Sequence, residues 1–272
     1  GGKPEVIARL KDGEFAEAPQ MLPDGTHVLF TLAASTGADR WARARVVVQA
    51  VSSPVQEVII EGGTDARYLP TGHIVYAVGG VLFAVAFDLA RMRVIGNPVA
   101  VAAGVRRSPD LTVSGTAHFS ISQSGTLIYV PGVVGDAGSQ QDIAVMERGG
   151  GVEPLNLPPG AYEFPRVSPD GNRIAFGNGD NEAAVWIYER QGTSAMRRLT
   201  FGGKSRYPVW SPDGQRIAFQ SDRDGDRGIF WQAADGTGAP ERLTRADGAS
   251  SHAPVSWSPD GNTLLFDVTT GG

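Results

Sequence analysis

One phrase of ten residues recurs along this chain and constrains its fold more than any other feature. In its clearest form it reads WSPDGQRIAF at 210–219, VSPDGNRIAF at 167–176 and WSPDGNTLLF at 257–266. Weaker copies are MLPDGTHVLF at 21–30, YLPTGHIVYA at 68–77 and ISQSGTLIYV at 121–130. The turn glycines of the six copies lie 43 to 53 residues apart. This interval is close to the period of repeats that each form one four-stranded propeller blade.

Within one copy, the Pro-Asp-Gly step between two apolar runs predicts a hairpin turn. Proline fixes φ, aspartate bonds the local backbone, and glycine adopts a positive φ. In the clearest copy, short segments between polar turns at 207–210, 216–219, 228–231 and 241–244 predict four short strands, and no convincing amphipathic helix occurs. We therefore predict an all-β fold for residues 1–272, a single six-bladed β-propeller domain with four-stranded antiparallel blades.

The sixth blade is predicted to be incomplete. Residues 255–257 and 263–266 supply its first two strands, and residues 4–10 resemble a fourth strand, but no third strand is apparent. Three outcomes stay open: irregular pairing of the N-terminal strand, a homodimer in which a second chain supplies the missing strand, or completion by residues of a longer parent chain.

Composition and motifs exclude several classes of function. The chain has no Cys, which excludes disulfide scaffolds, thiolate catalysis and thiolate-bound metals. The net charge of −5 argues against a nucleic-acid partner. No apolar run reaches the ~18 residues of a membrane span, and the N-terminal GGKP shows no signal peptide. The Gly-x-Ser-x-Gly elbow of α/β-hydrolases is also absent.

The repeated phrase, extended in the fifth copy by QSDRDG and followed by an apolar strand and RLT, resembles the TolB-like β-propeller family. The resemblance is strongest over 162–268. It is weaker but traceable over 1–161. The first half of the chain, with DARYLPTGHIVYA and LFAVAFDLARMRVIGNPVAV, resembles the propeller found C-terminal to bacterial serine/threonine kinase domains, although no kinase motif is present. The resemblance implies an extracytoplasmic bacterial scaffold, periplasmic or secreted, that binds proteins or peptides at its rim or channel mouth. One fold hosts many functions, so the site must be argued separately.

Stacking the six copies on their turn glycines gives one candidate site. Each copy carries an ionisable or imidazole side chain near the start of its first strand, the innermost strand of a blade: Glu17, Asp65, His118, Glu163, Arg206 and His252. We predict that these residues meet at the channel mouth and bind a protein, peptide or small molecule there. The alternative that they are only the polar lining of a wet channel stays open.

The same residues allow a second hypothesis, metal-dependent hydrolysis of the lactonase or phosphotriesterase type, which other six-bladed propellers perform. His118, His252 and Asp65 would hold a divalent cation such as zinc, calcium or manganese, which lowers the pKa of a bound water. Glu163 and Arg206 are the catalytic candidates, with Arg206 stabilising an oxyanion. The leading hypothesis is a non-catalytic binding module, and the sequence names neither its ligand nor its parent protein.

Overall fold

The computed structural model describes residues 5–33, 40–108, 114–132, 143–146, 151–155, 157–158, 160–178, 183–191 and 196–270. Every regular element in these ranges is a β-strand, and no helix long and apolar enough to cross a membrane occurs among them. The chain separates into two compact units, each described by itself below. The first comprises Gly2–Ala117 and Gly132–Ala137, and the second comprises Gly1, His118–Pro131 and Gly138–Gly272.

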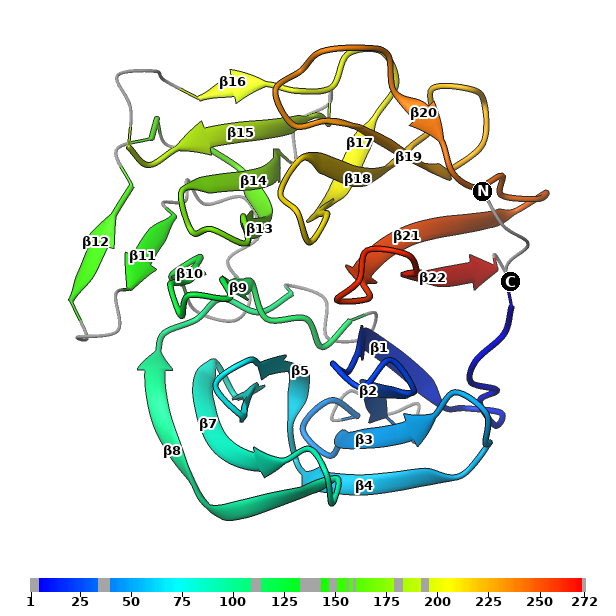
Figure 1. The fold of residues 1–272 in the computed structure, drawn as a ribbon. Coiled ribbons are helices and arrows are strands. Elements are labelled where there is room, and N and C mark those ends of the chain that lie inside the picture. The colour runs from blue at the N-terminus through cyan, green and yellow to red at the C-terminus, as the bar shows by residue number, and fades with distance from the viewer. Residues whose placement is uncertain are drawn as a thin grey trace. The chain divides into compact units, whose positions relative to one another are not determined.

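The first unit contains two four-stranded antiparallel blades, in which the strands follow one another in chain order (Figure 1). Blade one consists of β1 (Phe15–Met21), β2 (His27–Ala33), β3 (Arg45–Ala50) and β4 (Gln56–Glu61). Blade two consists of β5 (Thr64–Leu69), β6 (His73–Val78), β7 (Val81–Asp88) and β8 (Arg93–Ala103). Leu22, Leu29, Ile74 and Tyr76 belong to one buried cluster, so apolar packing joins the two blades.

The second unit contains three more blades of the same order and one sheet of two strands. Blade three consists of β9 (Phe119–Ile121), β10 (Leu127–Tyr129), β11 (Ala144–Met146) and β12 (Val152–Pro154). Blade four consists of β13 (Tyr162–Val167), β14 (Arg173–Asn178), β15 (Val185–Glu189) and β16 (Arg197–Arg198). Blade five consists of β17 (Ser205–Trp210), β18 (Arg216–Ser221), β19 (Gly228–Ala233) and β20 (Glu241–Arg242). The two-stranded sheet consists of β21 (Ser250–Trp257) and β22 (Leu264–Thr270).

The predicted hairpin turn is confirmed, and its bonds are local. In blade five the amide of Gly214 donates to the carbonyl of Ser211 at 2.9 Å, and Gly214 has a φ of +66°. The Ser211 hydroxyl donates to Asp213 at 2.5 Å, while Asp213 accepts from the amide of Gln215 at 2.9 Å. Because every donor and acceptor lies within a few residues, the phrase forms the same turn wherever it recurs.

The predicted number of blades requires a correction. The described residues form five four-stranded blades and one two-stranded sheet, rather than six blades. The strands β21 and β22 overlap the first two strands predicted for the incomplete sixth blade, at 255–257 and 264–266, and both are longer than predicted. Residues 5–10 form no strand, and the carbonyl of Ile7 accepts a hydrogen bond from Nε2 of Gln49 at 2.9 Å. Pro4 lies outside the described residues.

Apolar packing joins the blades of the second unit as well. Phe176, Ile174 and Tyr162 of blade four share a buried cluster with Ile128 of blade three. Trp210 is buried in a cluster that unites blades four and five, and Trp231 stacks on Trp257 with ring centroids 5.8 Å apart. These tryptophans therefore pack between blades.

Candidate functional site

The first strands of four blades share a backbone irregularity. In β1, β5, β13 and β17 the pairing with the second strand shifts register at the same repeat position. The residue seven positions before the turn glycine has a φ between +50° and +57° in these strands; it is Ala18, Asp65, Phe164 or Tyr207. Such a left-handed conformation costs an L-residue roughly 1–2 kcal/mol. Strain of this kind clusters at functional sites, so this position directs attention to its side chains.

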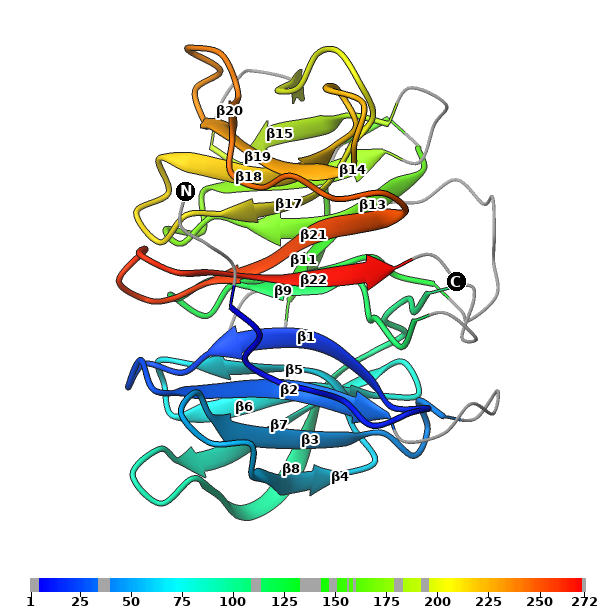
Figure 2. The same cartoon turned by 90° about the vertical axis from the view of Figure 1, so that its right-hand side faces the viewer.

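In the second unit this repeat position carries a row of rings from three successive blades. The first strands β9, β13 and β17 are neighbours, and β21 follows β17 (Figure 2). The rings of His118 and Phe164 are stacked, with centroids 5.4 Å apart and planes at 20°. Phe164 in turn contacts Tyr207 at 4.5 Å and 57°. His118 is buried, but Phe164 and Tyr207 are only half-buried, so the row is partly accessible to solvent.

Charged groups of both signs surround the phenol of Tyr207. Burial raises the pKa of Tyr207, and the carboxylates of Glu163 and Asp267 raise it further, while Arg206 and Arg227 act in the opposite direction. The phenol therefore stays protonated at neutral pH and can donate a hydrogen bond. We call the row of rings together with these charges the Tyr207 cluster: His118, Phe164, Tyr207, Glu163, Arg206, Arg227 and Asp267.

His252 lies in β21 and has partners on all sides. Its amide donates to the carbonyl of Arg227 at 2.9 Å, and its carbonyl accepts from Nε2 of Gln220 at 2.8 Å. Nδ1 lies 2.9 Å from Oγ1 of Thr244, and the ring packs on Phe266 with centroids 5.1 Å apart. These contacts tie the two-stranded sheet to blade five, so His252 has a structural role.

We expect His252 to make the stability of the protein depend on pH. Burial lowers its pKa below the ordinary value of 6.5, although Asp247 and Asp226 oppose this shift. On acidification, the unfolded chain therefore binds a proton at a higher pH than the folded protein does. The contribution of neutral His252 to the free energy of unfolding is complete above pH ~6.5 and is lost as the pH falls through the folded-state pKa. Thermal unfolding should show a smaller acid-induced drop in Tm for His252→Gln than for the wild type. Equal drops in the two proteins would contradict this assignment.

In the first unit, both carboxylate oxygens of Asp65 are engaged. Oδ2 accepts from the amide of Ala117 at 2.9 Å, and Oδ1 pairs with Nη2 of Arg67 at 2.7 Å. The side chain is only 4% exposed. Asp65 thus fastens residues near Ala117 to the first strand of blade two.

Glu17 acts in a similar way in blade one. Its Oε2 accepts from the amide of Gly115 at 3.0 Å. Arg107 is buried nearby, and burial lowers its pKa while Asp65 and Glu17 raise it. The two predicted carboxylates therefore compensate a buried guanidinium and anchor the segment that precedes blade three.

The structure thus divides the predicted site residues between the two units. Glu17 and Asp65 lie together around Arg107 in the first unit, and Glu163 and Arg206 lie together around Tyr207 in the second unit. A common position at one channel mouth stays a prediction. Among the described residues, no three His, Asp or Glu side chains gather in a way that could hold a metal ion. The metal-ligand role of His118, His252 and Asp65 likewise stays a prediction.

Sequence reasoning missed several members of this arrangement. Phe164 and Tyr207 each follow directly after a predicted site residue, Glu163 or Arg206. They were not selected because the search was for charged and imidazole side chains, not for aromatic rings. Stacked on the turn glycines, the two aromatics occupy one repeat position, and this signal could have found them. Arg227 and Asp267 carry no such signal, because they lie outside the repeated phrase.

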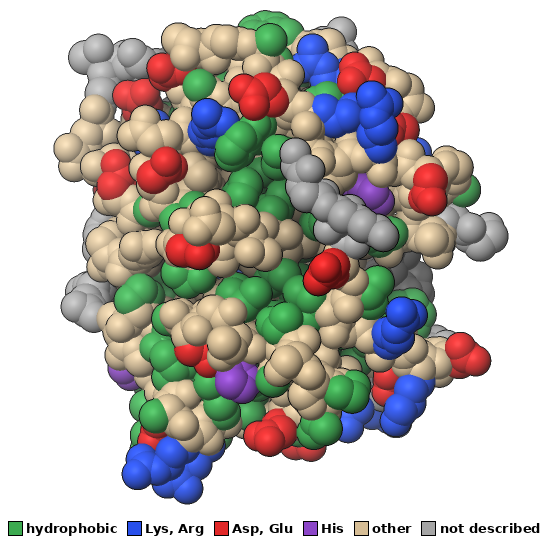
Figure 3. All heavy atoms as spheres, turned by 45° about the vertical axis from the view of Figure 1, so that its right-hand side comes forward, with side chains coloured by type: hydrophobic (Ala, Val, Ile, Leu, Met, Phe, Trp, Pro, Cys, Tyr) green, Lys and Arg blue, Asp and Glu red, His purple; other side chains and the backbone are tan. Residues whose placement is uncertain are grey.

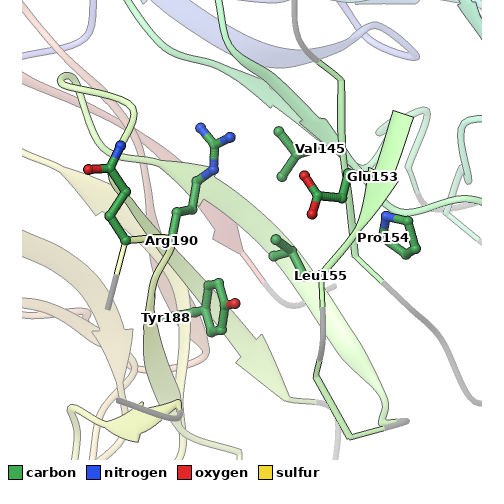
Figure 4. A pocket seen from close by; sticks show the side chains of 7 residues that line it. Val145, Glu153, Pro154, Leu155, Tyr188 and Arg190 are labelled. Atoms are coloured by element: carbon green, nitrogen blue, oxygen red, sulfur yellow. The ribbon is translucent and has the colours of Figure 1, made fainter. Parts of the chain in front are cut away.

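Two other surface features lie apart from the Tyr207 cluster. Figure 4 shows a pocket of about 170 Å³ between blades three and four, with Glu153, Tyr188 and Arg190 among its lining residues and the apolar Val145 and Leu155 beside them. On the face drawn in Figure 3, acidic and basic side chains are interspersed among the described residues. Neither sign forms a continuous region in that view, and such a region is what polyanions bind.

Comparison with known proteins finds a family model that matches just under half of the chain. Residues 141–272 match the family model of the TolB beta propeller domain. A search of curated proteins finds no match to the chain. The predicted resemblance to TolB-like propellers is confirmed by the family match and by solved structures.

Three solved structures illustrate the range of proteins with a similar fold. A putative TolB from Agrobacterium tumefaciens is 22% identical, with a TM-score of 0.58 over 79% of this chain and 74% of that one. TolB from Acinetobacter baumannii is 17% identical, with a TM-score of 0.64, and the match covers 91% of this chain but 62% of TolB. A gluconolactonase from Xanthomonas campestris is 10% identical, with a TM-score of 0.59 over 93% and 83%. At these identities the likeness shows the fold alone.

Proposed function

With residues 141–272 matching the TolB beta propeller domain, we propose that the protein is an extracytoplasmic binding module that holds a segment of a partner protein against the Tyr207 cluster. The location and the preference for proteins are what the resemblance to TolB-like propellers implies. The observation that carries the proposal is the row of rings at His118, Phe164 and Tyr207, two of them in a left-handed conformation.

The chemistry of the cluster suits a polypeptide. Partly exposed ring faces contact aliphatic, proline and aromatic side chains without demanding one residue type, and aromatic pairs add roughly 0.5–1.5 kcal/mol beyond area burial. Two carboxylates and two guanidinium groups flank the rings, so side chains of either sign find a partner. A small anion or cation would instead meet repulsion from half of these groups.

The strain at Phe164 and Tyr207 supports a function for these rings. Glycine would relieve it without cost to the backbone geometry, whereas Phe and Tyr are unusual residues at positive φ. Phe or Tyr at this position therefore lowers the free energy of unfolding relative to glycine. The conformation itself belongs to the bulge that four blades share; we attribute to binding the choice of large rings, instead of glycine, at this position in blades four and five.

The test compares Tyr207→Gly with a matched control. Met92 also has a positive φ, +50°, but lies in the turn between β7 and β8 of the first unit. Peptides selected from a displayed random library on the wild-type protein should bind Tyr207→Gly about tenfold more weakly and Met92→Gly unchanged, by calorimetry. We expect Tyr207→Gly to change the free energy of unfolding by no more than about 1 kcal/mol, because relief of strain offsets lost ring contacts.

A library that yields no binder, or binders equally tight for Tyr207→Gly, would refute the proposal. Phe164→Ala provides a second variant, which removes the central ring of the row and should weaken the same peptides.

The metal-dependent hydrolase stays an alternative hypothesis. The fold is shared with a gluconolactonase at 10% identity, which bears on fold and not on activity. Elemental analysis of the purified protein tests it directly, since stoichiometric zinc, calcium or manganese that is lost in a His118→Ala, His252→Ala double variant would favour the hydrolase over the binding module.

A further inference from the structure

The outermost strand of blade two, β8, differs from the outermost strands of the other four blades. It has 11 residues, whereas β4 has six, β12 has three, and β16 and β20 have two each. It is the last strand of its sheet, so its outer edge pairs with no other strand in the described part of the chain (Figure 1). A long open edge presents backbone donors and acceptors to which another chain can pair.

β8 also lacks the charges that protect such an edge. Charged side chains on an edge strand oppose pairing between molecules. In β8 the only charged residue is the first one, Arg93, and the run 94–105 contains none. The other outer strands all carry charges: Glu57 and Glu61 in β4, Glu153 in β12, Arg197 and Arg198 in β16, and Glu241 and Arg242 in β20.

The apolar side chains of β8 lie largely in solvent. Val99 is 65% exposed, Ile95 is 52% exposed and Val101 is 39% exposed. On the neighbouring strand β7, by contrast, Leu82 and Phe87 are buried. Several exposed apolar side chains on one strand are typical of an interaction surface, whereas single ones need no explanation.

We propose that two copies of the chain associate by pairing their β8 strands in antiparallel register about a two-fold axis. The pairing joins blade two of one copy to blade two of the other in a continuous sheet, and it covers the exposed valines of both. This association goes beyond the function proposed above, because β8 belongs to the first unit and the Tyr207 cluster to the second.

The distribution of charge favours a second copy as the occupant. In an antiparallel pair the two Arg93 side chains lie at opposite ends of the contact, while residues 99–103 of both copies are valine and alanine. No like charges then face each other, and such a pair would destabilise the sheet. A charged segment of another protein would meet only Arg93 on β8. Among the outer strands of the described blades, β8 is therefore the best complement to itself.

The backbone of β8 limits the contact to a short segment. Pro98 has no N–H to donate, and Gly96, with a φ of +75°, lies where the pairing with β7 shifts register. A second shift lies between Ala100 and Ala102. These interruptions and the two-fold symmetry end the assembly at two copies. A contact this short is small against the ~20–30 residues a side of a stable interface, so we expect monomer and dimer in equilibrium.

Sedimentation velocity of the 272-residue protein tests the proposal. Rising concentration should increase the weight-average mass from 28.6 kDa toward twice that value. Val99→Lys should weaken the association about tenfold or more, because it places a positive charge on both edges. Val152→Lys is the matched control and should have no effect, since Val152 is 52% exposed on β12, the outer strand of blade three. Circular dichroism checks that each variant is folded.

Opposite charges should restore the contact. Val99→Lys and Val99→Glu should each associate about tenfold more weakly than the wild type, while an equimolar mixture of the two should recover the wild-type association constant. An interface that brings β8 of one copy beside β8 of the other predicts this rescue. Failure of the mixture to associate, with both variants folded, would contradict the pairing.

The salt dependence provides a further readout. Each copy has a net charge of −5, so two copies repel each other at long range, and the proposed contact contains no ion pair. Raising the salt concentration from ~20 to ~300 mM screens the repulsion and should strengthen the association. A contact built from ion pairs would weaken instead, and that result would count against β8.

Hydrogen exchange measured by mass spectrometry locates the contact. At concentrations where the dimer dominates, the amides of Val99–Ala103 should exchange about fivefold more slowly than in the monomer, and those of Leu264–Thr270 should not change. This comparison separates β8 from the sheet of β21 and β22, through which the sequence predicts a homodimer.

Three further results would overturn the proposal. The mass stays at 28.6 kDa at protein concentrations up to ~1 mM; Val99→Lys associates as tightly as the wild type; or protection appears at Leu264–Thr270 and not at Val99–Ala103. The last result would assign the dimer to β21 and β22. None of these measurements depends on Tyr207, and Tyr207→Gly should leave the association unchanged, so the two proposals fail independently.

Discussion

Replacing Gly203 with alanine should lower the free energy of unfolding by about 3 kcal/mol, through left-handed strain together with overpacking. Gly203 has a φ of +72°, and a Cβ there would lie 2.7 Å from both Cα and N of Arg223. That backbone cannot move freely, because the amide of Lys204 donates to Asp222 at 2.6 Å. Chemical denaturation of the purified variant, followed by circular dichroism, measures the loss.

The neighbouring Gly202 provides a matched control for this variant. Its φ is +75°, but a Cβ there would meet nothing within 4 Å. Gly202→Ala therefore carries only the conformational cost and should lose about 1 kcal/mol. Equal losses in the two variants would show that the approach to Arg223 contributes nothing, and that the loop relaxes around an added methyl group.

The second large effect is expected at Asp65, where Asp65→Ala should cost about 4 kcal/mol, since it leaves buried charge and an amide without partners. The variant removes the acceptor of the Ala117 amide and the partner of Arg67, and it removes one of the two carboxylates that compensate Arg107. It also places alanine at a φ of +54°, which aspartate tolerates better.

Asp65→Asn separates these causes. Asparagine tolerates the left-handed conformation and still offers an oxygen to the Ala117 amide, but it carries no charge. We expect it to lose about half as much stability as Asp65→Ala. If the free energy of unfolding of Asp65→Ala is instead within about 1 kcal/mol of the wild-type value, the carboxylate has no structural role. Its predicted role as a metal ligand would then gain support.

These two sites illustrate different limits of sequence reasoning. The six-fold phrase predicted the turns, the short strands and the resemblance to TolB-like propellers, because a Ser-Pro-Asp-Gly turn is built from bonds between residues at most five apart, as between Ser211 and Arg216. Gly203 lies outside the phrase, and no neighbouring residue in the sequence indicates that it packs against the backbone of Arg223. Its importance arises from an approach of two loops.

The candidate site shows the same division. Stacking the repeats predicted that Glu163 and Arg206 lie near one another, since equivalent positions on neighbouring first strands are adjacent in any propeller. It assigned Glu17 and Asp65 to a ligand, and that role stays a prediction; it did not foresee that they accept hydrogen bonds from the amides of Gly115 and Ala117, 98 and 52 residues away. An isolated carboxylate in a sequence does not reveal whether its lone pairs are already satisfied.

By itself, the sequence determined the repeating unit and its class, because hairpin turns and alternating apolar strands depend on near neighbours and recur with the phrase. Only the tertiary structure decided the rest: the register shifts that turn Phe164 and Tyr207 to positive φ, and the stacking of three rings from different blades. The physical reason is that the register shift arises only when the first and second strands of a blade pair, and the ring stacking only when first strands of neighbouring blades pack side by side. Residues that look alike in the repeats therefore acquire different tasks only once the blades are packed together.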